Sequence, residues 1–176
     1  AYLEAHAHGA VHTRDFQRAM ERASGRNLDG FFQQYVHGAG HPELDVNVSH
    51  ADGLLSVSVT QKQSGPGVAE AFSFPLVVDV VDAAGETQRR TRPADARNRS
   101  VAIPTPEAPT RVEVDPDMAV LGKLTLKAGR PLLLAALRDG SSVPVRLAAS
   151  AALLEEGSVE AVSAVCTALT DDPFWG

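Results

Sequence analysis

The spacing of apolar residues changes twice along this chain, and this change limits the possible folds more than any other feature. Apolar side chains recur every three or four residues in 1–40, at alternate positions between Leu44 and Val114, and at helical spacing again from about Pro131. A period of 3.6 residues indicates a helix with one buried face, and a period of two indicates a strand with one buried face. We therefore expect a helical segment, a strand-rich segment and a second helical segment, in that order.

The first segment predicts two amphipathic helices. Thr13 is placed to cap the first helix and Gly25 to end it. Asn27 is placed to cap the second helix, which Gly38 and Gly40 end. The second helix carries one apolar stripe, formed by Leu28, Phe31, Phe32, Tyr35 and Val36. We expect this stripe to pack in a core rather than to bind a cofactor, because such stripes usually face a core.

The middle segment predicts an antiparallel β-sandwich of about six short strands. Alternating apolar residues mark most of these strands: Leu44 to Val48, Leu55 to Val59, Phe72 to Val80, Val101 to Ile103, and Val112 to Val114. A polar strand is expected near Glu86 to Thr91, and Asp52-Gly53 predicts a hairpin turn. Pro75 predicts a strand edge or a bulge, because proline lacks the N–H that a central strand needs.

The last segment predicts short helices with small residues at their contacts, which is typical of the start of an α-solenoid. Pro131 is placed in the first turn of one helix, Asp139-Gly140 end it, and Ser142 can cap the next. We expect the inner face of this next helix to comprise Leu147, Ala148, Ala151 and Leu154. A further helix carries Val159, Val162, Val165, Cys166 and Leu169. The final "DDPFWG" would then begin another repeat.

Charge and composition exclude several classes of partner. The chain has 176 residues and a net charge of -6, and acidic proteins with scattered cations do not favour nucleic acid or anionic membranes. One basic cluster stands out, which we interpret as a solvated loop or edge strand rather than a phosphate site: Arg89, Arg90, Arg92, Arg97 and Arg99. No apolar run approaches the roughly 20 residues of a membrane span. A single cysteine excludes an internal disulfide framework, and a cytoplasmic location is favoured.

Two groups of histidines are candidate metal sites. His37 and His41 have the spacing of an H-E-x-x-H zinc box, but Gly38 replaces the glutamate and Pro42 forces an extended backbone before it. The other group comprises His6, His8 and His12. His8 and His12 are four residues apart, but Gly9 between them weakens any helix that would place them on one face. We therefore predict no metal, cofactor-binding or catalytic residue in this chain.

Other catalytic patterns are incomplete. Cys166 lies on an apolar helix face without a nearby histidine, which favours a packed thiol over a nucleophile. The glycine-containing stretches Ser64 to Gly67 and Gly129 to Pro131 lack the lysine of a phosphate loop. Asp171-Asp172 precede a proline and predict a turn or a cap.

The chain resembles zinc-dependent aminopeptidases of the aminopeptidase N type. The resemblance is strongest in "AYLEAHAHGAVHTRDFQRAMERASGRNLDGFFQQYVHGAGHPEL", where the family pattern falls on Thr13, Asp15, Phe16, Ser24, Gly25, Leu28, Phe31, Phe32, Gln34, Tyr35, Gly40 and Pro42. Tyr35 stands where the family usually has tryptophan. "VEVDPD", Val112 to Asp117, is similar to the strand that closes the family's sandwich, and "DDPFWG" to the junction reached in bacterial members with HEAT repeats. Arg146 follows a short apolar pair as in a HEAT-type repeat.

This resemblance implies three parts of a larger peptidase. Residues 1–41 would be the helical end of the catalytic domain, 42–126 an immunoglobulin-like β-sandwich, and 127–176 the start of a HEAT-like helical domain. The parent would remove N-terminal residues from peptides with zinc held upstream of Ala1, so this excised piece would be inactive alone. Its partners would be the upstream catalytic domain and the downstream helical domain. Apolar residues normally covered by them, notably on the first helices and around Phe174 and Trp175, would favour self-association.

Two alternatives remain from the residues and the resemblance. The chain could belong to a non-catalytic interaction scaffold with the same architecture, because some relatives have lost the zinc box. It could instead be a free-standing sandwich that binds peptide or carbohydrate, although this leaves the helical resemblance unexplained.

Overall fold

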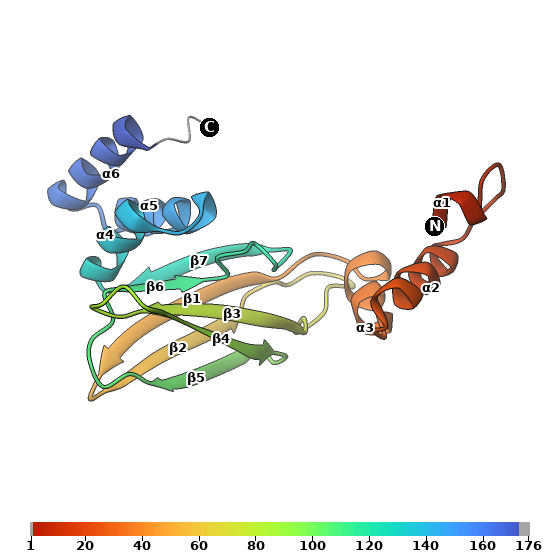
Figure 1. Cartoon of the computed structure of the whole chain (residues 1–176), viewed down its shortest axis with the longest axis horizontal. Coiled ribbons are helices and arrows are strands. Elements are labelled where there is room, and N and C mark those ends of the chain that lie inside the picture. The colour runs from red at the N-terminus through yellow and green to blue at the C-terminus, as the bar shows by residue number, and fades with distance from the viewer. Residues whose placement is uncertain (1, 173–176) are drawn as a thin grey trace. The chain divides into compact units, whose positions relative to one another are not determined.

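The computed structural model describes residues 2–172, which form two compact units. The first, the helical unit, comprises Ala1–Gly40 and the loop Ser64–Ala69; the second, the sheet unit, comprises His41–Gln63 and Glu70–Gly176. Phe174 and Trp175, for which an exposed apolar surface is predicted, and all of "DDPFWG" beyond Asp172 lie outside the described residues. Across the described residues there are six α-helices, one π-helix and two β-sheets, and the chain is therefore a mixed α and β protein (Figure 1).

The helical unit consists of short helices. These are α1 (Tyr2–Ala5), α2 (Thr13–Ser24), α3 (Asp29–Phe32) and the π-helix η1 (Gln33–His37), which continues α3. His12, not the predicted Thr13, is the N-cap of α2, and its N–H donates to the Asp15 carboxylate at 2.9 Å. This bond holds the pKa of Asp15 below its ordinary value. Gly25, with φ of 66°, ends the helix as predicted.

The aromatic stripe of the second predicted helix is only partly in a core. Phe32 is buried and contacts the Phe16 ring edge to face, with 6.3 Å between ring centroids. Phe31 and Val36, which were predicted to be core residues, are each 46% exposed. The reason is that α3 has only four residues and is followed by a short π-helix. A segment this short can bury one side against α2 but not the whole aromatic stripe. Asn27 does not occupy the N-cap position, which is Leu28, but its side chain accepts from the Asp29 N–H.

The sheet unit contains seven strands in two sheets (Figure 1). One sheet has the order β5-β2-β1-β7 and the other the order β4-β3-β6. Their bounds are β1 Glu43–Ala51, β2 Leu54–Gln61, β3 Phe74–Val81, β4 Thr87–Ala94, β5 Asn98–Pro104, β6 Arg111–Val114 and β7 Lys123–Ala128. The predicted Asp52-Gly53 hairpin joins β1 to β2, with φ of 51° and 73°. The prediction that all strands are antiparallel is wrong, because β7 returns parallel to β1.

Alternate residues of both sheets form the apolar core. Buried side chains on β1, β2 and β3 comprise Leu44, Val46, Val48, Leu55, Val57, Val59, Phe74, Leu76, Val78 and Val80. Pro75 lies in the central strand β3, but at a position where only β4 is paired, opposite Pro93. At Pro75, β3 therefore has a neighbouring strand on one side only, and a proline without an N–H is tolerated there as it is on an edge strand.

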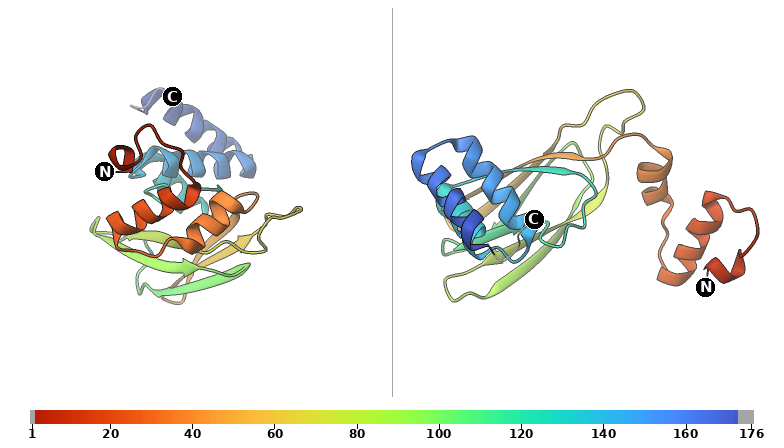
Figure 2. Two further views of the ribbon diagram at one scale, coloured as in Figure 1. Left: turned by 90° about the vertical axis from the view of Figure 1, so that its right-hand side faces the viewer. Right: turned by 90° about the horizontal axis from the view of Figure 1, so that it is seen from above.

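Three helices follow the last strand, namely α4 (Arg130–Asp139), α5 (Val143–Glu156) and α6 (Val159–Asp171). Figure 2 shows them gathered on one side of the strands, where α4 contacts β6 and α5 contacts β7. The predicted inner face of α5 is wrong: Leu147 and Leu154 are 60% and 51% exposed. The buried residues are Val145, Ala149 and Leu153. No helix in residues 2–172 has the length and apolar character needed to cross a bilayer.

Candidate functional site

Charged residues on neighbouring strands form a row across the three-stranded sheet. Arg89 of β4 lies opposite Asp79 of β3, and Asp79 lies opposite Glu113 of β6. Arg89 donates twice to Asp79, from Nε at 2.9 Å and from an Nη at 2.7 Å, and also reaches Asp117 at 2.7 Å. The hydrogen bonds that Arg89 donates to the carboxylates of Asp79 and Asp117 raise its pKa above the ordinary value. Asp79 is buried, so its charge depends on this bidentate partner.

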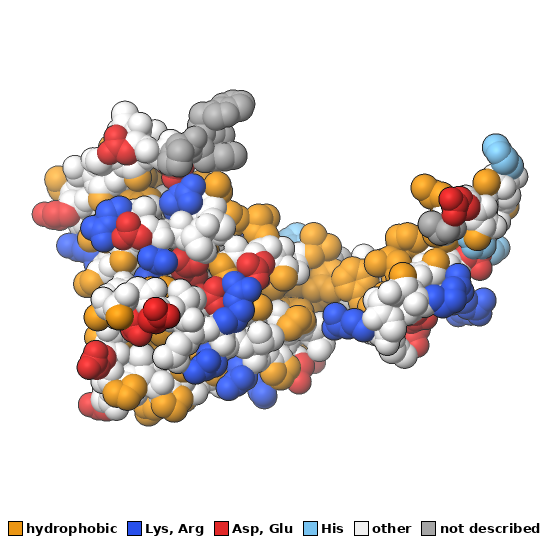
Figure 3. Space-filling view, viewed as in Figure 1, with side chains coloured by type: hydrophobic (Ala, Val, Ile, Leu, Met, Phe, Trp, Pro, Cys, Tyr) orange, Lys and Arg blue, Asp and Glu red, His pale blue; other side chains and the backbone are white. Residues whose placement is uncertain are grey.

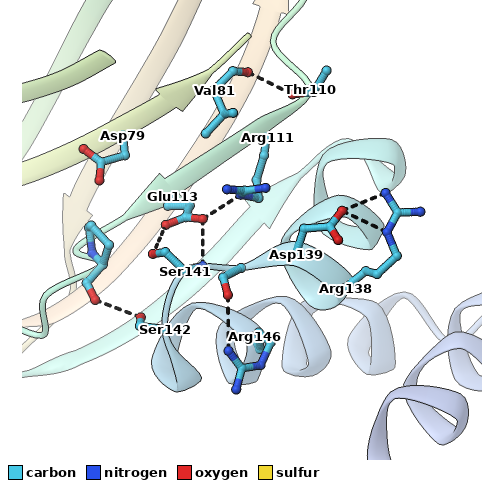
Figure 4. A network of polar contacts seen from close by, with 12 residues as sticks. Asp79, Val81, Thr110, Arg111, Glu113, Arg138, Asp139, Ser141, Ser142 and Arg146 are labelled. Atoms are coloured by element: carbon cyan, nitrogen blue, oxygen red, sulfur yellow. Dashed lines mark hydrogen bonds and ion pairs between the residues drawn. The ribbon is translucent and has the colours of Figure 1, made fainter. Parts of the chain in front are cut away.

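Glu113 connects this row to the terminal helices (Figure 4). Its carboxylate is 1% exposed and accepts from Arg111 Nε at 2.6 Å. The Ser141 amide, in the turn between α4 and α5, donates to Glu113 Oε1 at 3.0 Å, and the Ser141 hydroxyl donates to Oε2. Ser142 is the N-cap of α5, but its hydroxyl accepts no bond from an N–H of that helix and instead donates to the Pro116 carbonyl. The α4–α5 turn is thus fixed to β6 and to the loop after it.

A second ion pair fixes the end of α6. Arg146 of α5 donates to Asp172 from Nε at 2.5 Å and from an Nη at 3.1 Å, and its other Nη donates to the Gly140 carbonyl at 3.2 Å. Gly140 is closely packed, because a Cβ there would meet the Ala136 carbonyl and the side chain of Arg146. The predicted cap role of Asp172 is confirmed, since it is the C-cap of α6.

Gln61 forms a polar centre inside the sheet unit. The side chain is fully buried, and its amide pairs with the backbone of Phe72 as a strand would. Nε2 donates to the Phe72 carbonyl at 2.8 Å, and Oε1 accepts from the Phe72 N–H at 2.8 Å. Gln63 donates to the same Oε1 at 2.9 Å. These bonds hold the segment before β3 against the end of β2.

The candidate metal-site histidines lie at turns and helix ends. His37 ends η1, and His41 follows Gly40, whose φ of 75° turns the backbone. His12 caps α2, whereas His8 has φ of 61° in the turn before it. Within residues 2–172, no cluster of three histidine, cysteine or carboxylate side chains has the geometry to hold a metal ion.

The other candidates from the sequence are Cys166 and two glycine-containing stretches. Cys166 is exposed, so the prediction of a packed thiol is wrong. The reason is that α6 buries Ala161 and Val165, and Cys166 faces away from them. Ser64 to Gly67 belong to a loop of the helical unit, in which Val68 bridges to Ala39, and Gly129 is the N-cap of α4.

The basic cluster is divided between two sheet edges. Arg89, Arg90 and Arg92 lie on β4 and Arg99 on β5, and both strands are edges, which confirms the edge-strand prediction. Arg90 and Arg92 donate to backbone carbonyls of their own strand.

Sequence reasoning missed the residues that join elements. Ser141 and Gln61 belong to no motif. Glu113 lies in the stretch "VEVDPD", but no role of its own was predicted for it, and only the alternation within β6 indicates that it points to the opposite face from Val112 and Val114. The buried side chains of Gln61 and Glu113 hold separate segments of the sheet unit together.

Comparison with known proteins supports a relation at the level of fold. No protein family profile and no curated protein matches the chain. A crystal structure of Legionella pneumophila aminopeptidase A, in complex with aspartic acid, is similar with a TM-score of 0.69 and 15% sequence identity. The match covers 98% of this chain and 22% of that chain. This chain therefore has the fold of one part of that aminopeptidase and spans less than a quarter of its length.

Proposed function

We propose that this chain is a non-catalytic structural portion of a zinc-dependent aminopeptidase of the aminopeptidase N type. The observation that carries the proposal is the match to Legionella aminopeptidase A, which includes nearly all of this chain but only 22% of that protein. A match of this kind supports a role as one segment within a longer enzyme. The parent would remove N-terminal residues from peptides, and its zinc would be held by residues outside this chain.

The exposed apolar surface supports the same proposal. Phe16, Phe31 and Val36 of the helical unit are between 44% and 46% exposed. Large apolar side chains gathered on one small unit usually mark a surface that another part of a protein covers. In the proposed enzyme, the catalytic domain would cover this surface, and these helices would be its last helical layer.

The sheet unit would serve as an immunoglobulin-like spacer. Its two sheets with buried alternate residues support this assignment, as does the tight attachment of the α4–α5 turn to Glu113. The three terminal helices would begin a HEAT-like domain. The Arg146–Asp172 pair, which ties α5 to the end of α6, supports this part of the proposal.

Peptidase activity of two lengths of the protein tests the proposal. We expect the 176-residue chain to leave an aminoacyl p-nitroanilide intact, with or without added zinc. The protein extended through the upstream part of its gene should bind zinc and cleave that substrate, and a chelator should abolish cleavage. Cleavage by the 176-residue chain alone would overturn the proposal. An extended protein that folds but neither binds zinc nor cleaves would favour the interaction scaffold.

A further inference from the structure

Four arginines of the helical unit are spaced four residues apart. Arg14, Arg18 and Arg22 lie on α2 at positions i, i+4 and i+8, and Arg26 follows the helix end at Gly25. Residues four apart share one face of an α-helix, so the three helical arginines form a single row about 6 Å apart along the axis. All four side chains are exposed. We call these four residues the arginine row; Figure 3 shows Lys and Arg side chains gathered on the helical unit.

The arginine row has no hydrogen-bonded partner among residues 2–172, although Arg18 and the Asp15 carboxylate attract each other through space. None of its guanidinium groups forms a hydrogen bond or an ion pair with any residue in 2–172. This contrasts with the sheet unit, where Arg89, Arg111, Arg130 and Arg146 each contact a carboxylate.

Carboxylates beside the row are already hydrogen-bonded to other groups, and Asp15 accepts from the His12 N–H at 2.9 Å. Glu21 accepts from the Leu28 N–H at 2.9 Å and from Gln17 Nε2 at 3.2 Å. Asp29 accepts from the same Gln17 nitrogen at 2.5 Å. Gln17 is buried and donates to both Glu21 and Asp29. The two carboxylates are therefore held by Gln17 rather than by the arginines.

Two concave surfaces run along the row. One, of about 440 Å³, lies between α2 and the α3–η1 segment, and its lining includes Arg14, Arg18, Gln33 and His37. The other is shallow and open to solvent, and it continues past Arg18 to Arg22, Arg26 and Asn27. A partner placed here would meet the arginines, the side-chain amides of Gln33 and Asn27, and two carboxylates, Glu21 and Asp29.

We propose that this groove docks an acidic protein segment in helical form. A helix with carboxylates at every fourth position repeats at the same spacing as the arginine row, so several charge-assisted hydrogen bonds can form together. A nucleic acid fits less well, because its backbone carries a phosphate at every nucleotide and would bring some of them next to Glu21 and Asp29, whereas a helix can place neutral side chains opposite these two carboxylates. The docking segment should therefore alternate carboxylates with neutral polar residues.

Titration with a designed peptide tests this surface on the 176-residue chain. The probe is a labelled 16-residue peptide with glutamate at every fourth position and alanine or glutamine elsewhere. We expect the triple variant Arg14→Gln/Arg18→Gln/Arg22→Gln to bind it about tenfold more weakly, since three exposed charge contacts are lost. The triple variant with lysine at these positions should bind within about threefold of the original chain, because it keeps the charge.

A matched variant separates local recognition from overall charge. Arg90→Gln/Arg92→Gln/Arg97→Gln removes the same three charges from the sheet unit and should leave binding unchanged. Far-ultraviolet circular dichroism checks that each variant keeps its helices. Equal losses in the two glutamine variants, tighter binding of a 16-nucleotide single-stranded DNA, or equal binding of a peptide with glutamine in place of glutamate would each overturn the proposal. Failure of the lysine variant to bind, or no binding of the glutamate peptide by the original chain, would do the same.

Discussion

The carboxylate of Glu113 accepts hydrogen bonds from both the amide and the hydroxyl of Ser141, a residue 28 positions further along the chain. This contact joins β6 to the turn between α4 and α5 while Arg111 balances the buried charge. A buried carboxylate is tolerated only when such partners compensate its lost hydration. Glu113 therefore contributes strongly to the attachment of the helices, together with the Ser142–Pro116 hydrogen bond and the packing of α4 on β6 and α5 on β7.

Replacing Glu113 with alanine should destabilise the sheet unit strongly. The variant leaves Arg111 and Ser141 without their acceptor, and breaking a buried charged contact costs about 3–5 kcal/mol. Urea unfolding followed by circular dichroism measures the change in free energy. Glu155→Ala, at an exposed position of α5, is the control and should change stability by less than about 0.5 kcal/mol. Similar losses in the two variants would show that Glu113 does not hold the helices.

Replacing Gln61 with leucine should also cost stability, although the two side chains are similar in size. Leucine cannot pair with the Phe72 N–H and carbonyl, and each buried backbone group that loses a partner costs about 1–3 kcal/mol. We expect a total loss of about 2–5 kcal/mol in urea unfolding. Gln88→Leu, on the exposed face of β4, should change little. A Gln61→Leu variant as stable as the original would mean that water or other groups satisfy Phe72.

The Arg130–Glu156 pair should make stability depend on pH in a defined direction. The hydrogen bond from Arg130 holds the pKa of Glu156 below its ordinary value of 4.5. A lowered folded-state pKa contributes stability above the unfolded-state value, and this contribution is lost as the pH falls through the folded-state value. The Arg130→Gln variant should therefore be less stable than the original at pH 7, and the difference should vanish in acid below pH 4.5.

Urea midpoints of the two proteins across this pH range measure the difference. Both partners are solvent-accessible, so added salt should reduce it at pH 7. A difference that grows as the pH falls would show that the ion pair is not its cause.

The order of helix, strand and helix could be predicted because apolar period is a local property of the sequence. The hairpin at Asp52-Gly53 and the helix end at Gly25 could be predicted for the same reason, since both depend on residues with positive φ. The parallel return of β7 to β1 could not be predicted, because it pairs segments about 80 residues apart and no local pattern specifies it.

Side-chain roles were harder to predict where contacts are distant. Glu113 was expected only as part of an alternating strand, and its burial depends on α4 and on Ser141, which come later in the chain. The arginine row is visible in the sequence as a spacing of four, but the engagement of Glu21 and Asp29 by Gln17 is visible only in the fold.

A comparison of two adjacent leucines of α5 tests which face of that helix is buried. Leu154 is predicted from the sequence to lie on the buried face. Alanine and leucine occupy nearly all sides of α5, so the apolar pattern alone does not single out one face. In the structure Leu153 is fully buried, whereas Leu154 is 51% exposed. Leu153→Ala should cost about 2–5 kcal/mol of unfolding free energy through lost apolar contact and a cavity. Leu154→Ala should cost less than about 1 kcal/mol, because alanine favours the helix and little packing is lost. Urea unfolding of both variants measures the contrast, and a larger loss at Leu154 would restore the face that the sequence predicts.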